Sequence, residues 1–183
     1  KTHIVNSFTN MVNSIMSPVE RATSAVIESG LSKLQGRQAE RFLSEVPADV
    51  LGAIQGIPEG TRGFLQTIKT GVSPTSVSKY EFRPSAFKGK TGRVINAPVN
   101  LLEAADNLNY NINFRQALNA EIVREGRKQG LKGSKLVDYI ADTKANPPAD
   151  MIKQASDTAN YRLFRAEGSG IAEALYKFRD WGF

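Results

Sequence analysis

Two pairs of glutamates are the residues whose type and spacing come nearest to a catalytic arrangement. Paired carboxylates cleave glycosidic bonds when one is buried as the acid, the other is solvated, and a cleft separates them by about a nanometre or less. Glu121 and Glu125 lie one helical turn apart beside Arg124, which is typical of a solvated helix face. Glu40 and Glu45 form the other pair. No aromatic cleft is indicated around either pair, so we expect no enzymatic activity.

Cysteine and histidine, the other common sources of catalytic and metal-binding groups, are nearly absent. The chain has no cysteine and one histidine, His3, beside its N-terminus. Disulfides, thiolate nucleophiles and cysteine metal sites are therefore excluded, and a histidine-dependent triad or zinc cluster is disfavoured because the imidazole needs a packed scaffold. We expect no catalytic residue, no metal and no cofactor.

A short glycine-lysine segment resembles the end of a phosphate-binding loop. Gly89-Lys-Thr-Gly92 has the lysine and threonine, but the Walker pattern needs another glycine upstream, with four residues between it and Gly89, after a buried apolar strand. Pro84, Ser85 and Ala86 stand where that strand would end. Nucleotide binding is not expected.

Much of the net charge of +6 comes from one segment, residues 72–97, which also holds prolines, glycines and aromatic residues. Alternating basic and aromatic side chains occur in single-strand nucleic-acid binders, where cations follow phosphates and rings stack on bases. The alternative is a loop that Tyr80, Phe82 and Phe87 anchor against a partner or a neighbouring helix, since loops of this length rarely lack support. The candidate nucleic-acid or partner contacts are Lys79, Arg83, Lys88, Lys90 and Arg93.

The composition is that of a folded chain. A hydrophobic content of 40% and a charged content of 23% are near ordinary globular values, and 183 residues suffice to bury a core. No secretory signal and no run of about 20 apolar residues is visible. Because the chain starts at Lys1 and ends on apolar residues, we expect it to be a piece of a longer protein.

Helix signals dominate the first third of the chain. Apolar spacing predicts a helix over residues 4–15, and the capping-box pattern Ser17-Pro-Val-Glu20 predicts a second helix that stops at Gly30. A third pattern starts near Gln35 and is interrupted by Pro47, because proline lacks an amide proton.

The next helical pattern, residues 49–69, contains a row of four glycines beside Pro58. On one helix these glycines would form a smooth stripe along which another backbone can approach closely. The alternative is a turn between two short helices, with Pro58 as the break, and we give that interpretation the larger weight. The candidate packing glycines are Gly52, Gly56, Gly60 and Gly63.

A long helix crowded with asparagine is predicted from Pro98 to about Glu125 or Gly126. Asparagine is a poor helix former, since its amide competes for nearby backbone groups, so packing on two sides must stabilise this helix. Its asparagines would then supply hydrogen bonds to other chains or segments. The first apolar row consists of Leu101, Ala105, Leu108 and Ile112, and the second of Tyr110, Phe114 and Ala117.

Three shorter helices are expected towards the C-terminus. Ser134 would cap a helix over residues 135–144, Asn146-Pro147-Pro148 would separate it from the next, and a last helix would begin at Ile171. The middle helix carries a narrow alanine-rich stripe suited to close packing. That stripe is Ile152, Ala155, Ala159, Leu163 and Ala166.

These elements predict an all-α fold. We divide the chain into an N-terminal helical segment (1–71), a basic loop containing aromatic residues (72–97) and a C-terminal helical segment (98–183). The pattern leaves open whether the helices form a compact bundle or stay extended.

Several of these motifs, in order, resemble a segment of the very large internal virion and DNA-ejection proteins of tailed bacteriophages. The glycine-basic turn leads to a proline-started helix with a central aspartate, then to an alanine-rich helix. A departure lies in that last helix, where Leu163-Phe164 replaces the family's threonine-phenylalanine pair. The matching residues are Gly92-Arg-Val-Ile-Asn-Ala-Pro98, Leu101-Leu102-x-Ala-Ala-Asp106, Asn113-Phe-Arg115, Ala120, Glu125-Gly126, Asn146-Pro147 and Ala159-x-Tyr-Arg-Leu-Phe164.

The resemblance implies a structural protein of the virion that takes part in genome ejection. It implies a place in the capsid interior or at the portal and tail, then in the host cell envelope. The implied partners are portal, tail or other ejection proteins and further copies of the chain, with DNA contact and membrane passage both open. It transfers no catalytic residue. The alternative function is a nucleic-acid-binding segment of a virion-packaged protein, such as a piece of a packaged polymerase.

Overall fold

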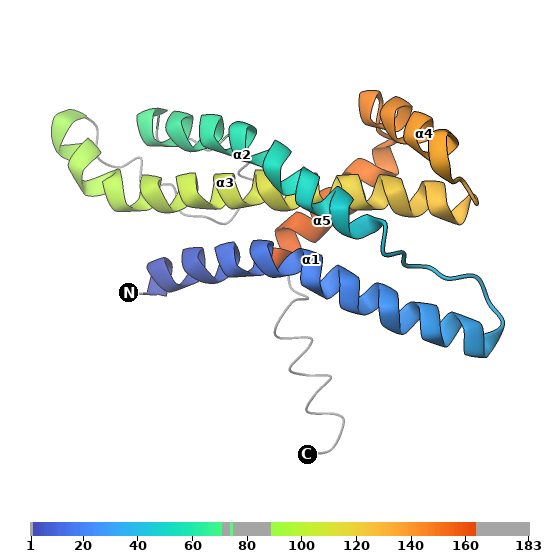
Figure 1. The fold of residues 1–183 in the computed structure, drawn as a ribbon. Helices are drawn as coiled ribbons and strands as arrows, with labels where there is room; N and C mark the ends of the chain where they lie inside the picture. Colours follow the sequence, from blue (N-terminus) through green and yellow to red (C-terminus); the bar gives the residue numbers. More distant parts are fainter. Residues whose placement is uncertain (1, 71–73, 75–88, 164–183) are drawn as a thin grey trace, which may run out of the picture.

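Five α-helices make up the part of the chain that the structure describes, and no strand occurs among those residues (Figure 1). The structure is a computed structural model that describes residues 2–70, 74 and 89–163. The all-α prediction is confirmed, and the helices pack on one another. The helices are α1 (Thr2–Gln35), α2 (Glu45–Thr70), α3 (Gly89–Lys128), α4 (Gly133–Ala145) and α5 (Ala149–Arg162).

The longest helix, α3, is the centre of the arrangement (Figure 1). Helix α2 runs antiparallel to it and makes the most extensive contact between any two of the described helices. Helix α1 crosses both α2 and α3, while α5 and α4 pack on the C-terminal half of α3. Each of the other helices therefore depends on α3 for its position.

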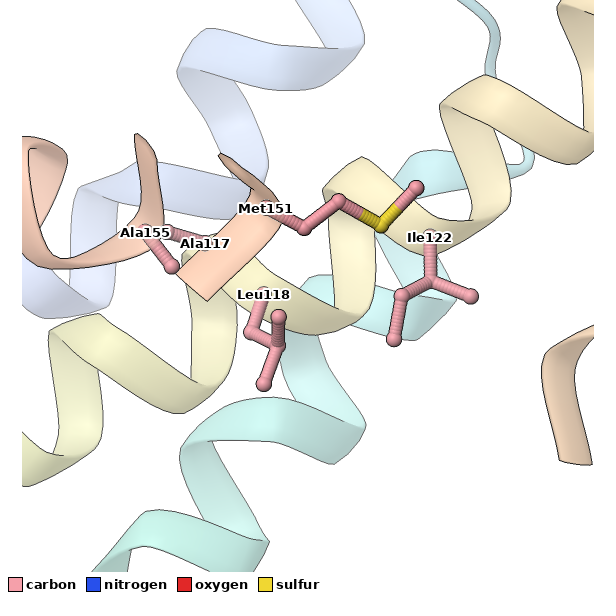
Figure 2. Packing of buried hydrophobic residues seen from close by; sticks show 5 residues of the cluster. All are labelled: Ala117, Leu118, Ile122, Met151 and Ala155. Atoms are coloured by element: carbon pink, nitrogen blue, oxygen red, sulfur yellow. The ribbon is translucent and has the colours of Figure 1, made fainter. Parts of the chain in front are cut away.

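The apolar core is small and joins α3 to α5 (Figure 2). Ala155, Ala159 and Leu163 are buried as the predicted stripe requires, but Ile152 is exposed and Met151 fills the core one position earlier. Ala166 lies outside the described residues. The core cluster consists of Ala117, Leu118, Ile122, Met151 and Ala155, with Phe114, Tyr139 and Ile140 packed against it.

The two helices predicted over residues 4–30 are one helix, α1, with Pro18 inside it. Ser17 is not a cap, because its buried hydroxyl donates a hydrogen bond to Asp49 Oδ2 of α2 at 2.7 Å. That packing holds the helix through the proline, which removes only one backbone hydrogen bond. The capping-box prediction was therefore wrong.

Helix α1 ends five residues beyond the predicted stop at Gly30. Gly36 has φ +63°, and the Arg37 amide donates to the Ser32 carbonyl at 3.0 Å, which together form a Schellman ending. Gly30 stays helical, so it was wrongly predicted as the C-cap.

Helix α2 begins at Glu45, so the predicted helix from Gln35 to Pro47 is wrong, and residues 36–44 are a connection. Pro47 falls in the first turn of α2, where amide protons have no intrahelical partner. The Glu45 carboxylate accepts the Phe42 amide at 2.8 Å and fixes this start. Pro58 lies inside α2 and does not divide it.

Helix α3 begins at Gly89, nine residues before the predicted start at Pro98. The loop predicted over 72–97 is therefore wrong for residues 89–97, while most of residues 72–88 lie outside the described part. Helix α3 ends at Lys128, a turn at Gly130 (φ +79°) follows, and the N-cap of α4 is Lys132 instead of Ser134. The last predicted helix, beginning at Ile171, also lies outside the described residues.

Candidate assembly site

The four glycines of α2 lie in a row against α3, and all four are buried. A Cβ atom at Gly56 would lie 2.6 Å from Ile112 Cα, and one at Gly60 would lie 2.9 Å from the Leu108 carbonyl oxygen. At Gly52 and Gly63 the same atom would meet the Arg115 carbonyl and the Asn107 side-chain amide. No side chain fits between these helices, so their backbones are in close contact. The turn to which we gave the larger weight is wrong at this place.

The face of α3 that receives this row differs from the predicted apolar row. Leu108 and Ile112 contact Gly60 and Gly56 and are half-buried, as is Ala105, while Leu101 is exposed. The fully enclosed positions of α3 are mostly polar or small. They include Ala104, Asn107, Asn113, Gln116, Asn119 and Ala120.

The buried amides of α3 bind neighbouring segments of the same chain. Asn113 Nδ2 donates to Ser14 Oγ at 2.8 Å, and Gln116 Nε2 donates to the Ser14 carbonyl at 3.0 Å. Asn119 Nδ2 donates to Gln55 Oε1 of α2 at 3.0 Å. Satisfied polar groups of this kind hold helices in one register, because leaving them unpaired would cost about 1–3 kcal/mol each.

A buried network of charges joins α1, α2 and α3. Arg21 of α1 binds Asp49, and its Nη1 lies 3.5 Å from Glu45 Oε2. Arg124 of α3 binds the same Glu45 oxygen at 2.7 Å and Glu121 Oε2 at 2.5 Å. Glu45 and Glu121, which the sequence analysis considered as catalytic carboxylates, are therefore each paired with arginine.

Burial and charge act on the arginines of this network in opposite ways. Burial acts to lower the pKa of Arg124, but the hydrogen bond and charge of Glu45, together with Glu121, raise it on balance. For Arg162 of α5, burial and the nearby charge of Arg21 lower the pKa. Arg162 Nη1 donates to Asn113 Oδ1 at 3.3 Å, which ties α5 to the same junction.

The outward face of α1 is apolar, while its inward face is small and polar. Ser14, Ser17, Arg21, Ala25 and Ser32 are buried. On the opposite side eight large apolar residues are exposed, and we call them the outer α1 row. They are Val12, Ile15, Met16, Val19, Val26, Ile27, Leu31 and Leu34.

Helix α2 also has its large apolar residues on its outward face. Its glycine row faces α3, and large apolar residues face away from α3, with the exposed basic residues Arg62 and Lys69 beside them. Monomeric proteins rarely expose continuous apolar patches larger than a few hundred Å², so two exposed apolar helix faces in one chain are unusual. The outer α2 row consists of Val50, Leu51, Ile54, Ile57, Leu65 and Ile68.

The basic candidates are not assembled into a site by the described residues. Lys79, Arg83 and Lys88 lie outside the described part, and Lys90 and Arg93 lie in the first turns of α3, where side chains are not described. Within the described ranges, no group of three or more acidic, histidine or cysteine residues is placed to hold a metal ion.

Sequence reasoning missed the residues of the buried junction. It gave no role to Arg21, Asp49 or Ser14, considered Glu45 only as one of a possible catalytic pair, and considered Ser17 only as a helix cap. One signal was available, because the small and polar residues of α1 repeat at spacings of three and four along one face. Such a row indicates an inward face when the opposite row is apolar throughout.

No family model matches the chain, and no curated protein or solved structure is significantly similar to it. None of the described helices has both the length and the hydropathy that a membrane crossing requires.

Proposed function

We propose that this chain is a structural module of a virion-packaged protein, of the class that takes part in genome ejection from tailed bacteriophages, and that it acts by binding other protein surfaces. One observation carries the proposal: the long helices α1 and α2 turn small and polar residues inward and large apolar residues outward. The sequence resemblance supplies the biological setting, namely the capsid interior or the portal and tail, then the host envelope.

The inner contacts explain how such a module keeps its shape while its apolar residues face outward. Glycine packing between α2 and α3 needs no apolar side chains, and the ionic and amide contacts fix α1 against both. The large side chains are thus left for partners. The named partners are portal, tail or other ejection proteins and other copies of the chain.

The test is made on intact virions of the phage that encodes the full protein. Mass spectrometry should find the protein in purified particles and find it depleted from capsids that have been triggered to release DNA. Deleting the segment should leave particles that contain DNA but deliver it poorly. Particles that never contain the protein would refute the proposed function.

A second candidate, binding to the entering nucleic acid, is favoured by one observation. Lys90 and Arg93 lie three residues apart in the first turns of α3, where a helix N-terminus attracts phosphate. DNA affinity that falls steeply between low and high salt, and that is lost in Lys90→Glu/Arg93→Glu, would support this candidate.

A further inference from the structure

The outer α1 row and the outer α2 row lie on opposite sides of the molecule. Where α1 and α2 cross, Ser17 and Arg21 face Asp49, and each outer row is on the far side of its helix from that contact. Figure 1 shows α1 and most of α2 on either side of α3. One partner surface therefore cannot cover both rows at once.

The two rows are alike in length and in chemistry. From Val12 to Leu34 the α1 row spans roughly 33 Å, and from Val50 to Ile68 the α2 row spans roughly 27 Å, at 1.5 Å per residue. The large residues of both rows are interrupted by small ones, Thr23 and Gly30 in α1 and Thr61 in α2. Large and small positions in alternation allow two helix faces to interdigitate.

Nothing among the described residues requires glycine at position 30. It lies inside α1 with an ordinary helical backbone, it is exposed, and a Cβ atom there would meet nothing within 4 Å. A helix-interior glycine costs stability relative to alanine. Its position among the residues of the outer α1 row would allow a second helix to approach closely.

We propose that the chain associates head to tail, with the outer α1 row of one copy packed against the outer α2 row of the next. This inference rests on the proposed function and names its partner as a second copy of the chain. From the exposed fractions, complete coverage of both rows would remove on the order of 700 Å² of apolar surface from water, at ~100 Å² per fully exposed aliphatic side chain. Stable interfaces bury at least about 1,200 Å² in total, and somewhat more than half of that area is apolar. The apolar area of such an interface is therefore close to that of the two rows.

Two consequences follow from the geometry. A single type of contact covers both rows of an interior copy, and because the two faces differ, the contact is heterologous and builds a ring or an open filament. A bilayer is disfavoured as the occupant, because anionic lipid binds clusters of lysines and arginines, and the described basic residues beside the rows are few, namely Lys33 on α1 and Arg62 and Lys69 on α2.

The test uses complementary variants of the full chain in light scattering over a concentration series. Val19→Glu/Val26→Glu damages the α1 row, and Ile54→Glu/Leu65→Glu damages the α2 row. The unaltered chain should form species larger than a dimer, each variant alone should be monomeric, and an equimolar mixture should form a 1:1 heterodimer. Circular dichroism confirms that each variant is folded.

Each control carries a single glutamate at an exposed position outside the rows. Ser29→Glu on α1 and Gln66→Glu on α2 should associate like the unaltered chain. Gly30→Leu adds apolar surface and favours the helix, yet it should weaken association at least tenfold because it blocks close approach. Equal or tighter association of Gly30→Leu would overturn the close contact at that residue.

Other results would overturn the proposal as a whole. A double variant that still forms dimers on its own would show that its undamaged row binds the same row of a second copy. An unaltered chain that stays monomeric but sediments with phosphatidylcholine–phosphatidylglycerol vesicles through the α1 row would show that lipid is the occupant. Because the chain lacks cysteine, disulfide formation between a Val26→Cys copy and an Ile54→Cys copy gives an independent measure of the contact.

The outcomes separate the two proposals. Head-to-tail association by a protein that is never packaged in virions would leave this inference intact and refute the proposed function. A packaged protein whose copies do not associate would do the reverse.

Discussion

At the scale of single residues, the absence of a side chain is as informative as its presence. Gly56 lies where a methyl group would meet the backbone of α3, whereas Gly30 lies where it would meet open space. Both glycines are helical and lose the same backbone entropy. The structure therefore predicts opposite effects for the same substitution.

Gly56→Ala should lower the free energy of unfolding by about 2 kcal/mol, since the overpacking penalty exceeds the gain in helix propensity. Gly30→Ala should raise it by about 0.5–1 kcal/mol. Urea denaturation at concentrations where the chain is monomeric measures both. Equal stabilisation by the two substitutions would show that α2 and α3 are not in close contact.

Asp49 binds both Ser17 and Arg21 of α1 in the buried junction. Asp49→Asn should lower the free energy of unfolding by about 3 kcal/mol, because Arg21 is left buried with only the more distant Glu45 as counter-ion. The matched control is Asp157→Asn, which breaks an exposed pair with Lys153 and should cost under about 0.5 kcal/mol. Thermal or urea denaturation compares the two, and similar small losses would contradict a structural role for the junction.

At the scale of elements, the helices differ in how firmly they are held. Helices α2 and α3 are in contact along most of α2, while α4 has no buried residue and packs beside Gly126 and, through Tyr139 and Ile140, against the core cluster. Because local opening is easiest where few contacts must break, stability should fall from the α2–α3 pair to α4.

Native-state hydrogen exchange should show this order directly. Amides of residues 52–67 in α2 and 104–123 in α3 should exchange slowest, through opening close to global unfolding. Amides of α4 should exchange fastest among the helices α2 to α5. Uniform protection across all four helices would contradict the hierarchy.

At the scale of the whole molecule, the association is expected to be apolar. The large residues of both rows are uncharged, and the outer face of α1 holds one acidic and one basic exposed residue, Glu20 and Lys33, so raising NaCl from 50 to 500 mM should leave self-association unchanged or slightly stronger. Light scattering or sedimentation at the two salt concentrations measures this. A sharp loss of association at high salt would show that charges outside the rows hold the copies together.

The sequence by itself determined that the chain is helical, and it located the asparagine helix, the proline break before α5 and the inward alanines Ala155 and Ala159. These features are local, because periodicity and proline act within a few turns. Helix boundaries at Ser17, Gly30 and Pro98 were wrong, since a cap is worth only about 1 kcal/mol and packing against other helices outweighs it.

Only the tertiary structure decided which face of each helix is the inner one. Apolar periodicity predicts that large residues face the core, but α1 and α2 turn them outward. The physical reason is that the glycine row lets the backbones of α2 and α3 meet, and paired charges and amides such as Asp49 and Asn113 then fill the remaining inner positions. Partners separated by 28 residues in one case and 99 in the other produce these contacts, so no local pattern could reveal them.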